Sequence, residues 1–135
     1  MASFGVRGTL LVAAIGDATT ITGLLLTGMG ERNLQGKTNF MIVERETSTE
    51  QIEETLRAFL ERSDIGIVLI SQNVAERVRN IIVEHERTIP TILEIPSKDT
   101  PYEAEKDTIV VRAAAILWGA EAGTDKLRAM QAGLK

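Results

Sequence analysis

Cysteine is absent from this chain of 135 residues, and histidine occurs only once. The absence of cysteine excludes a disulfide scaffold, a thiolate metal site and a cysteine nucleophile, and it is typical of proteins in a reducing compartment. The single histidine, His85, stands between Glu84 and Glu86 near the end of an apolar stripe. Because adjacent residues point to different faces of a helix, these three side chains are not expected to form a metal site.

A basic excess and a long apolar run are also missing. Fifteen lysines and arginines are interleaved with nineteen acids, for a net charge of -4, so nucleic acid is not an expected partner. No stretch approaches the ~20 apolar residues that span a bilayer. Residues 1–8 have the features of neither a signal peptide nor a transit peptide. We expect a soluble, cytosolic chain without direct membrane insertion, which reaches a membrane only through a partner.

Aromatic residues make up only 4% of the chain, although 44% of it is hydrophobic. The core is therefore expected to consist of Ile, Leu, Val and Ala, and a chain of this length predicts one domain. Four short apolar runs are typical of strands in a parallel sheet whose two faces are both buried. These runs cover residues 10–15, 40–43, 65–70 and 91–95, with Ile67 and Leu69 expected deep in the core.

The segments between these runs have helical spacing. Ser48 and Gln51 form a capping box before one amphipathic stripe. The stripe consists of Ile52, Leu56, Phe59 and Leu60. A second stripe extends from Val74 to His85, with Ser71 as its expected N-cap. Asp17 is the expected N-cap of a shorter helix that begins directly after the first run.

Alternation of strands and helices predicts an α/β fold with right-handed crossovers. The predicted architecture is a small flavodoxin-like (CheY-like) open parallel sheet of four strands in the order 2-1-3-4, with flanking helices and a C-terminal helix. This order is preferred over 1-2-3-4 because it covers both faces of the sheet. It places Glu94 on an edge strand, where a carboxylate is tolerated. We expect an α/β domain over residues 1–105, a partner-binding helix over 106–118 and a flexible or loosely helical tail over 119–135.

Ligands of such sheets bind where the carboxyl ends of the strands diverge. Asp17, Ser71, Ser97 and Lys98 are expected near that point. A receiver domain of bacterial signalling would need a second acid to hold Mg²⁺ and an acceptor aspartate where Ser71 stands. Asp17 and Ser71 are therefore interpreted as helix caps.

Gly28-Met29-Gly30 follows a predicted helix rather than a strand, so it is interpreted as a helix end and turn and not as a dinucleotide fingerprint. We expect no catalytic residue, no cofactor and no metal site. A fold of this type without chemistry usually serves as a module that binds other proteins. A stand-alone interaction adaptor and a degenerate receiver-like signalling domain are the alternative interpretations.

Three stretches carry a resemblance to a known family. They read IGDATTITGLLLTGMG over residues 15–30, SDIGIVLISQ over 63–72 and TILEIPSKDTPY over 91–102. Together they resemble the eukaryotic form of the F-subunit family of vacuolar-type (V-type) proton-pumping ATPases. The third stretch is the most specific, because neither composition nor fold would produce it by chance. The chain departs from the family pattern by continuing past Trp118.

The resemblance implies a function that composition and spacing do not reach. Members of this family are non-catalytic parts of the central rotor stalk, and they bind the coiled-coil shaft, which is the D subunit of the complex. Through the shaft they act on the catalytic hexamer and the membrane rotor, which couples ATP hydrolysis to proton transport. The ATP, Mg²⁺ and proton sites lie on other subunits. The implied location is the cytoplasmic side of endomembranes, such as the vacuole or lysosome, within a peripheral membrane complex.

The segment 109–118 is apolar almost all the way round a helix. A stripe of Val110, Ala113, Ala114 and Leu117 would be enough to cover one sheet. The other large apolar side chains would then be exposed and are the expected contacts of a partner helix, namely Ile109, Val111, Ile116 and Trp118. Ser97 and Lys98, in the proline-bounded loop before this helix, are further expected contacts. The alternative is that the Gly/Ala-rich tail folds back and covers this face.

Overall fold

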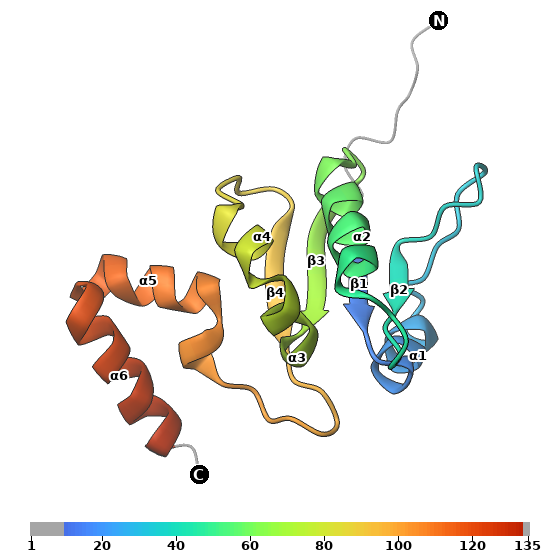
Figure 1. Ribbon diagram of the computed structural model, residues 1–135. Coiled ribbons are helices and arrows are strands. Elements are labelled where there is room, and N and C mark those ends of the chain that lie inside the picture. Colours follow the sequence, from blue (N-terminus) through green and yellow to red (C-terminus); the bar gives the residue numbers. More distant parts are fainter. Residues whose placement is uncertain (1–9, 134–135) are drawn as a thin grey trace, which may run out of the picture.

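The computed structural model describes residues 10–133. Residues 1–8, for which the sequence predicted no targeting peptide, and the last two residues of the tail lie outside the described part. The elements alternate along the chain as far as the fourth strand, and two longer helices follow it (Figure 1). In chain order they are β1 (Leu11–Gly16), α1 (Ala18–Leu26), β2 (Phe40–Ile42), α2 (Thr49–Glu61), β3 (Ile65–Ser71), α3 (Gln72–Ala75), the 3-10 helix η1 (Glu76–Val78), α4 (Arg79–Glu84), β4 (Thr91–Ile95), the 3-10 helix η2 (Ala104–Lys106), α5 (Thr108–Trp118) and α6 (Ala120–Gly133).

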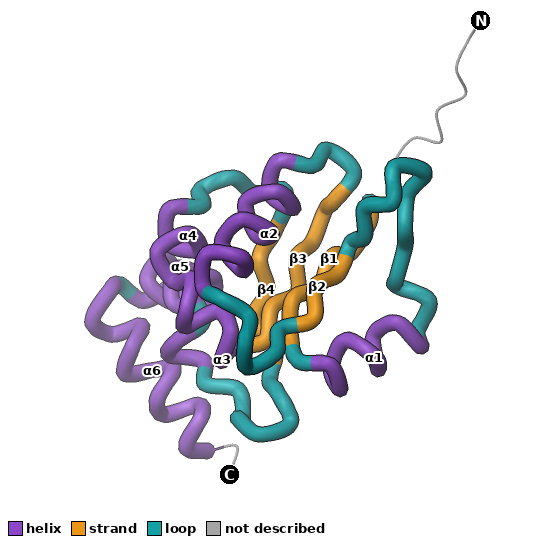
Figure 2. Tube along the Cα trace, turned by 45° about the vertical axis from the view of Figure 1, so that its right-hand side comes forward, coloured by secondary structure: helices purple, strands orange, loops and turns teal. Residues whose placement is uncertain are grey.

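The strands form one parallel sheet in the order β2-β1-β3-β4, which confirms the predicted topology. Helices α2, α3 and α4 cover one face of the sheet, and α1 lies on the other face (Figure 2). Asp17 begins α1 by accepting a hydrogen bond from the backbone N of Thr20 at 3.1 Å, and the expected capping box of Ser48 and Gln51 begins α2.

The hydrophobic core lies between the sheet and the layer of α2, α3 and α4. From the sheet it takes Ile15, Val68, Ile70 and Ile92, all of which are buried. From the helices it takes Ile52, Leu56, Phe59, Val78, Ile81 and Ile82. Among the residues that the structure describes, Phe59 is the only aromatic one in this core cluster, in line with the low aromatic content.

The expectation that both faces of every strand are buried is wrong. Ile67 and Leu69 on β3 are only half-buried, as is their neighbour Leu93 on β4. These side chains point to the face that carries α1, but α1 has nine residues and contacts β1 and β2. No other helix of the described chain lies on that face, because α5 does not return to the sheet after β4 (Figure 2).

This difference predicts unequal costs for two neighbouring core substitutions. Ile70 is fully buried, so Ile70→Ala should lower the free energy of unfolding by about 2–5 kcal/mol through lost burial and a new cavity. Leu69 is half-buried, so Leu69→Ala should cost about 1 kcal/mol in the isolated chain. Urea unfolding followed by circular dichroism measures both. Equal losses would mean that the α1 face is covered.

The predicted second helix is broken where the sequence suggested one continuous stripe. The segment divides into α3, η1 and α4, because Val78 has backbone angles of φ -124° and ψ 26°, which no helix continues through. Ser71 is the N-cap residue of α3, as the sequence predicts, but its side chain makes no capping hydrogen bond. The Ser71 hydroxyl is buried without a hydrogen-bond partner. An added Cβ on Gly16 would come within 2.4 Å of that hydroxyl, so a side chain at residue 16 would force the Ser71 hydroxyl to turn away.

Candidate partner-binding surface

Helices α5 and α6 form a C-terminal hairpin, residues 108–133, that extends from the β4 edge of the sheet (Figure 1). Asp107 begins α5, since its carboxylate accepts hydrogen bonds from the backbone N of Ile109 at 3.1 Å and of Val110 at 3.5 Å. Gly119 ends the helix with φ +86°, a left-handed conformation that favours glycine, and α6 starts at the next residue. The segment after Trp118, expected to be flexible or loosely helical, is thus a helix of 14 residues.

The two helices of the hairpin touch through small residues. Ala114 on α5 and Gly123 on α6 are both buried, and Leu127 is 6% exposed. An added Cβ on Gly123 would come within 2.9 Å of the backbone carbonyl of Ala114. The helices can therefore pack this closely only while residue 123 has no side chain.

Gly123→Val is expected to open the hairpin. The branched side chain would collide with the backbone of Ala114, which cannot move aside as a flexible side chain could. Trypsin should then cleave after Lys126 and Arg128 markedly faster than in the unchanged chain, while the α/β domain stays resistant. Ala122→Val is the matched control, because Ala122 is exposed on the same helix. Equal cleavage of the two variants would contradict the close contact.

Gln72 holds the loop before α5 against the end of β3. Its amide Nε2 donates to the backbone O of Glu103 at 2.8 Å, and its Oε1 accepts from the backbone N of Glu103 at 2.7 Å. The same Nε2 donates to Glu94 Oε2 at 3.0 Å. One buried side chain thus fixes residue 103, from which the chain enters η2 and α5.

Glu94 anchors the second part of this network. Its side chain is only 1% exposed although β4 is an edge strand, and it forms an ion pair with Arg79 at the start of α4. Arg79 also reaches Thr108 Oγ1 at 3.3 Å, at the start of α5. The carboxylate is tolerated in this strand because a guanidinium and an amide compensate its charge.

The base of the hairpin makes further polar contacts with its surroundings. The Tyr102 hydroxyl donates to Asp107, and burial together with this bond raises the pKa of that hydroxyl. Gln131 on α6 accepts from the backbone N of Ala104 at 3.1 Å and donates to the backbone O of Tyr102 at 3.0 Å. Arg112 donates to the carbonyl of Val83 at 2.6 Å and to that of His85 at 3.1 Å. These bonds fix the direction in which the hairpin leaves the sheet.

The far end of the hairpin is apolar and exposed. Ile116 is 86% exposed, Leu117 69% and Trp118 39%. Large apolar side chains that gather at one exposed site are typical of a binding surface. We refer to Ile116, Leu117 and Trp118 as the apolar tip.

The structure distributes the expected contact residues over three places. Ile116 and Trp118 lie at the apolar tip, while Val111 and Ile109 are half-buried nearer the base. Ile109 lines a hollow of about 250 Å³ between α5, α4 and β4. Ser97 is half-buried and Lys98 exposed in the loop after β4, away from α5 in sequence, and their role stays a prediction.

The predicted sheet-facing stripe of α5 is wrong. Ala113 and Leu117 are exposed, and Ala114 packs against Gly123 of α6 rather than on a strand. The tail does fold back onto α5, but it leaves Ile116 and Trp118 exposed. Sequence reasoning misses Leu117 at the apolar tip, because the helical stripe places it on the sheet side. The division into segments 1–105, 106–118 and 119–135 stays a prediction.

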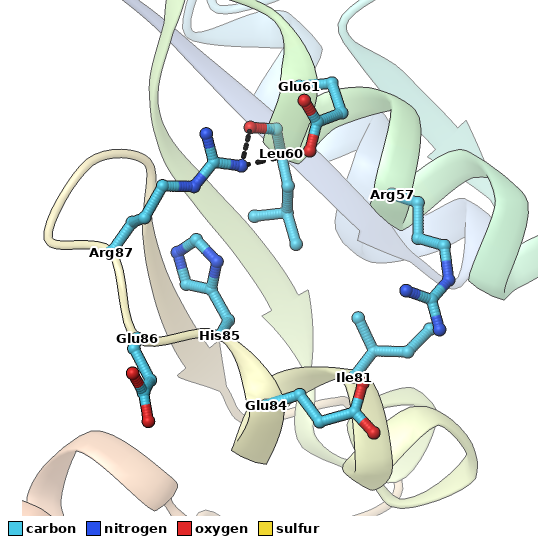
Figure 3. A pocket seen from close by; sticks show the side chains of 8 residues that line it. All are labelled: Arg57, Leu60, Glu61, Ile81, Glu84, His85, Glu86 and Arg87. Atoms are coloured by element: carbon cyan, nitrogen blue, oxygen red, sulfur yellow. Dashed lines mark hydrogen bonds and ion pairs between the residues drawn. The ribbon is translucent and has the colours of Figure 1, made fainter.

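A hollow of about 470 Å³ lies between α2 and α4 (Figure 3). Arg87 crosses its mouth and donates to the carbonyl of Leu60 at 3.0 Å and to Glu61 Oε1 at 3.1 Å. His85 lies with Nε2 at 2.7 Å from the carbonyl O of Pro90, which gives the ring a structural role. Among residues 10–133, no three His, Asp or Glu side chains gather in an arrangement that could hold a metal ion.

The switch point of the sheet is occupied by a helix cap. Thr20 Oγ1 donates to Asp17 Oδ1 at 2.7 Å, and this bond lowers the pKa of the Asp17 carboxyl. Asp17 is thus committed to the start of α1, as the sequence predicted. No helix of residues 10–133 has the length and apolarity to cross a bilayer.

Comparison with known proteins decides the family. The profile of the ATP synthase (F/14-kDa) subunit matches residues 12–112. The matched segment includes the first part of α5 and the whole sheet apart from the first residue of β1. The chain belongs to this family. The match ends within α5, so the apolar tip and the whole of α6 lie beyond it.

Individual members of this family agree with the resemblance in the sequence. The V-type proton ATPase F subunit of Xenopus laevis is 57% identical over 99 residues, which are 73% of this chain and 90% of that one. The protein of the same name in Dictyostelium discoideum is 44% identical over 112 residues, 83% of this chain and 93% of its own. A crystal structure of the V-type ATP synthase F subunit of Archaeoglobus fulgidus is 24% identical, with a TM-score of 0.48, and covers 65% of this chain and 99% of its own.

Proposed function

We propose that this chain serves as the F subunit of a V-type proton ATPase, a non-catalytic part of the central rotor stalk. It binds the coiled-coil shaft, the D subunit, and through the shaft it acts on the catalytic hexamer and the membrane rotor. It thereby helps couple ATP hydrolysis to proton transport. It works on the cytoplasmic side of endomembranes as part of a peripheral complex. The name shared by relatives that are 44% to 57% identical supports the choice of complex.

The observation that carries the binding role is the exposed apolar tip. Ile116 and Trp118 offer a large apolar anchor on a rigid helix, and buried Trp is frequent among the residues that dominate protein interfaces. Ala113, exposed on the same helix, leaves room for another helix to approach. Ile109 and Val111 continue this contact toward the base, and Ser97 with Lys98 adds a polar contact.

The polar network at the base suits a subunit that bears torque. The hairpin is held to the α/β domain by the side chains of Gln72, Arg79 and Arg112, each of which contacts backbone or a buried partner. A rotor subunit must turn with the shaft as one body, so its contact surface must not swing on a flexible linker. The network supplies that stiffness without any catalytic group.

Purification of the assembled complex tests the proposal. A tagged form of this chain, expressed in its own cells, should bring down the subunits of a V-type ATPase in fixed stoichiometry. The isolated chain should neither hydrolyse ATP nor take up phosphate from acetyl phosphate. Recovery as a lone monomer, or with unrelated partners, would instead favour the stand-alone adaptor. Phosphate uptake that disappears in Asp17→Ala would favour the receiver-like domain.

A further inference from the structure

The face of the sheet that carries α1 is half empty. The strand register shows which side chains share that face, because it aligns Val12 with Ile67 and Leu69 with Leu93. All four are half-buried, and so is Ile95 at the end of β4. We call these five residues, which lie beside α1 rather than under it, the open sheet face.

The open sheet face continues into an uncharged helix. Residues 18–30, which include α1, contain no charged side chain. A hollow of about 470 Å³ lies between the open sheet face and α1. Its lining includes Val12, Leu24 and Leu69 and contains no charged residue. Leu26 on α1 is 84% exposed and Leu10, just before β1, is 48% exposed.

The opposite face of the domain has a different character. Helix α2 exposes Glu54, Arg57 and Glu61 to solvent, and α4 adds Glu84. Such a charged exterior is what a domain surface in water requires. The domain is therefore asymmetric, with one solvated face and one uncharged, apolar face. Half-buried apolar side chains that gather on one face, beside the exposed Leu10 and Leu26, are typical of a contact with another molecule.

We infer that the open sheet face is a second docking surface, and that it receives one α-helix of a partner protein in the same complex. The inference rests on the proposed function, and it concerns a different surface from the apolar tip. Apart from Val12 on β1, which borders α1, the open sheet face is two strands wide, β3 and β4. At about 4.8 Å per strand this width matches the ~10 Å diameter of a single helix.

Charge and shape define the helix that fits. Its contacting stripe carries apolar or small side chains and no charge, because an unpaired charge against Ile67 and Leu93 would lose its hydration. A second copy of this chain does not fit, because α1 stands beside the open sheet face and would hold the faces of two copies apart. Residues 1–9 contain only Met1, Phe4 and Val6 as large apolar side chains, too few to cover the five of the open sheet face.

The absence of cysteine allows a direct test by thiol labelling. In Leu93→Cys the new thiol is the only one in the chain and lies on the open sheet face. A maleimide should label it readily in the isolated protein and at least about tenfold more slowly in the purified, assembled complex. Glu54→Cys, on the exposed side of α2, is the matched control and measures how far the complex restricts access in general. Ile67→Cys replaces the first variant if Leu93→Cys does not fold.

Cross-linking identifies the occupant. Benzophenone-maleimide attached to the new thiol at position 93 in the complex should cross-link to another protein of the complex, at positions three or four residues apart as on one helix face. Equal labelling of Leu93→Cys in the free and assembled states would overturn the inference. So would a thiol already blocked in the isolated chain, or a cross-link to residues 1–9 or to a second copy. If the chain enters the complex but labels freely, only this inference fails; if it never enters the complex, the proposed function fails with it.

Discussion

Arg79→Met is expected to lower the free energy of unfolding by about 3–5 kcal/mol, because it leaves a buried carboxylate without its counter-ion. The Glu94 side chain is 1% exposed, so water cannot replace the guanidinium of Arg79. The hydrogen bond that remains is donated by the neutral amide of Gln72, which cannot balance the charge. Urea unfolding of the isolated chain at neutral pH measures the loss.

Two further variants separate the buried charge from other effects of removing an arginine. Arg79→Met combined with Glu94→Gln removes both charges and should recover most of the lost stability. Arg87→Met removes an arginine from an ion pair with Glu61 whose side chains are 56% and 78% exposed. That loss should stay below about 1 kcal/mol. A cost of the same small size for Arg79→Met would show that the ion pair at the base of the hairpin is not needed for folding.

The combined substitution of Ile116→Asp and Trp118→Ala is expected to weaken binding to the shaft, the D subunit, by at least about thirtyfold, or ~2 kcal/mol. The first change places a charge in the centre of the proposed contact, and the second removes its largest anchor. The two side chains are 86% and 39% exposed in the isolated chain, so unfolding by urea should change little. The affinity is measured by titration calorimetry with the purified shaft protein.

Val83→Asp is the matched control for this pair. Val83 is 52% exposed on α4, so its replacement also converts an exposed apolar side chain into an acid. Because it lies outside the proposed contact, the affinity for the shaft should not change. Unchanged binding by the Ile116→Asp and Trp118→Ala variant would place the shaft contact elsewhere on the chain.

The strands and their order were predictable because their signals are local. Each strand lies in a short, mostly apolar run, and β4 spans the same residues, 91–95, as the run in the sequence. Once the alternation with helices is recognised, crossover handedness leaves few orders to choose from. The capping box at Ser48 is also local, since both of its partners lie within three residues.

The binding surface was only partly predictable because its contacts are distant along the chain. Gln72 bonds Glu103 across 31 residues, and nothing in either residue's neighbourhood signals the partner. The apolar character of 109–118 pointed correctly to exposed Ile116 and Trp118. It did not indicate that α6 would pack on Ala114, since that contact depends on the missing side chain of Gly123.

The open sheet face was missed for a related reason. Periodicity shows that Ile67 and Leu69 are apolar, but it does not show whether a helix of the same chain covers them. In a complete doubly wound fold the helix after the last strand would do so. Here α5 joins α6 beyond the sheet edge, and only the three-dimensional arrangement reveals the uncovered strands beside α1 (Figure 2).

Fluorine NMR of Trp118 tests the central claim most directly. Trp118 is the only tryptophan, so labelling with 5-fluorotryptophan gives a single resonance that reports on the apolar tip. Addition of the purified shaft protein should shift this resonance and saturate at one shaft per chain, because the ring passes from partial exposure to a buried contact. A resonance that stays unchanged while sedimentation shows a one-to-one complex would contradict the claim that α5 binds the shaft.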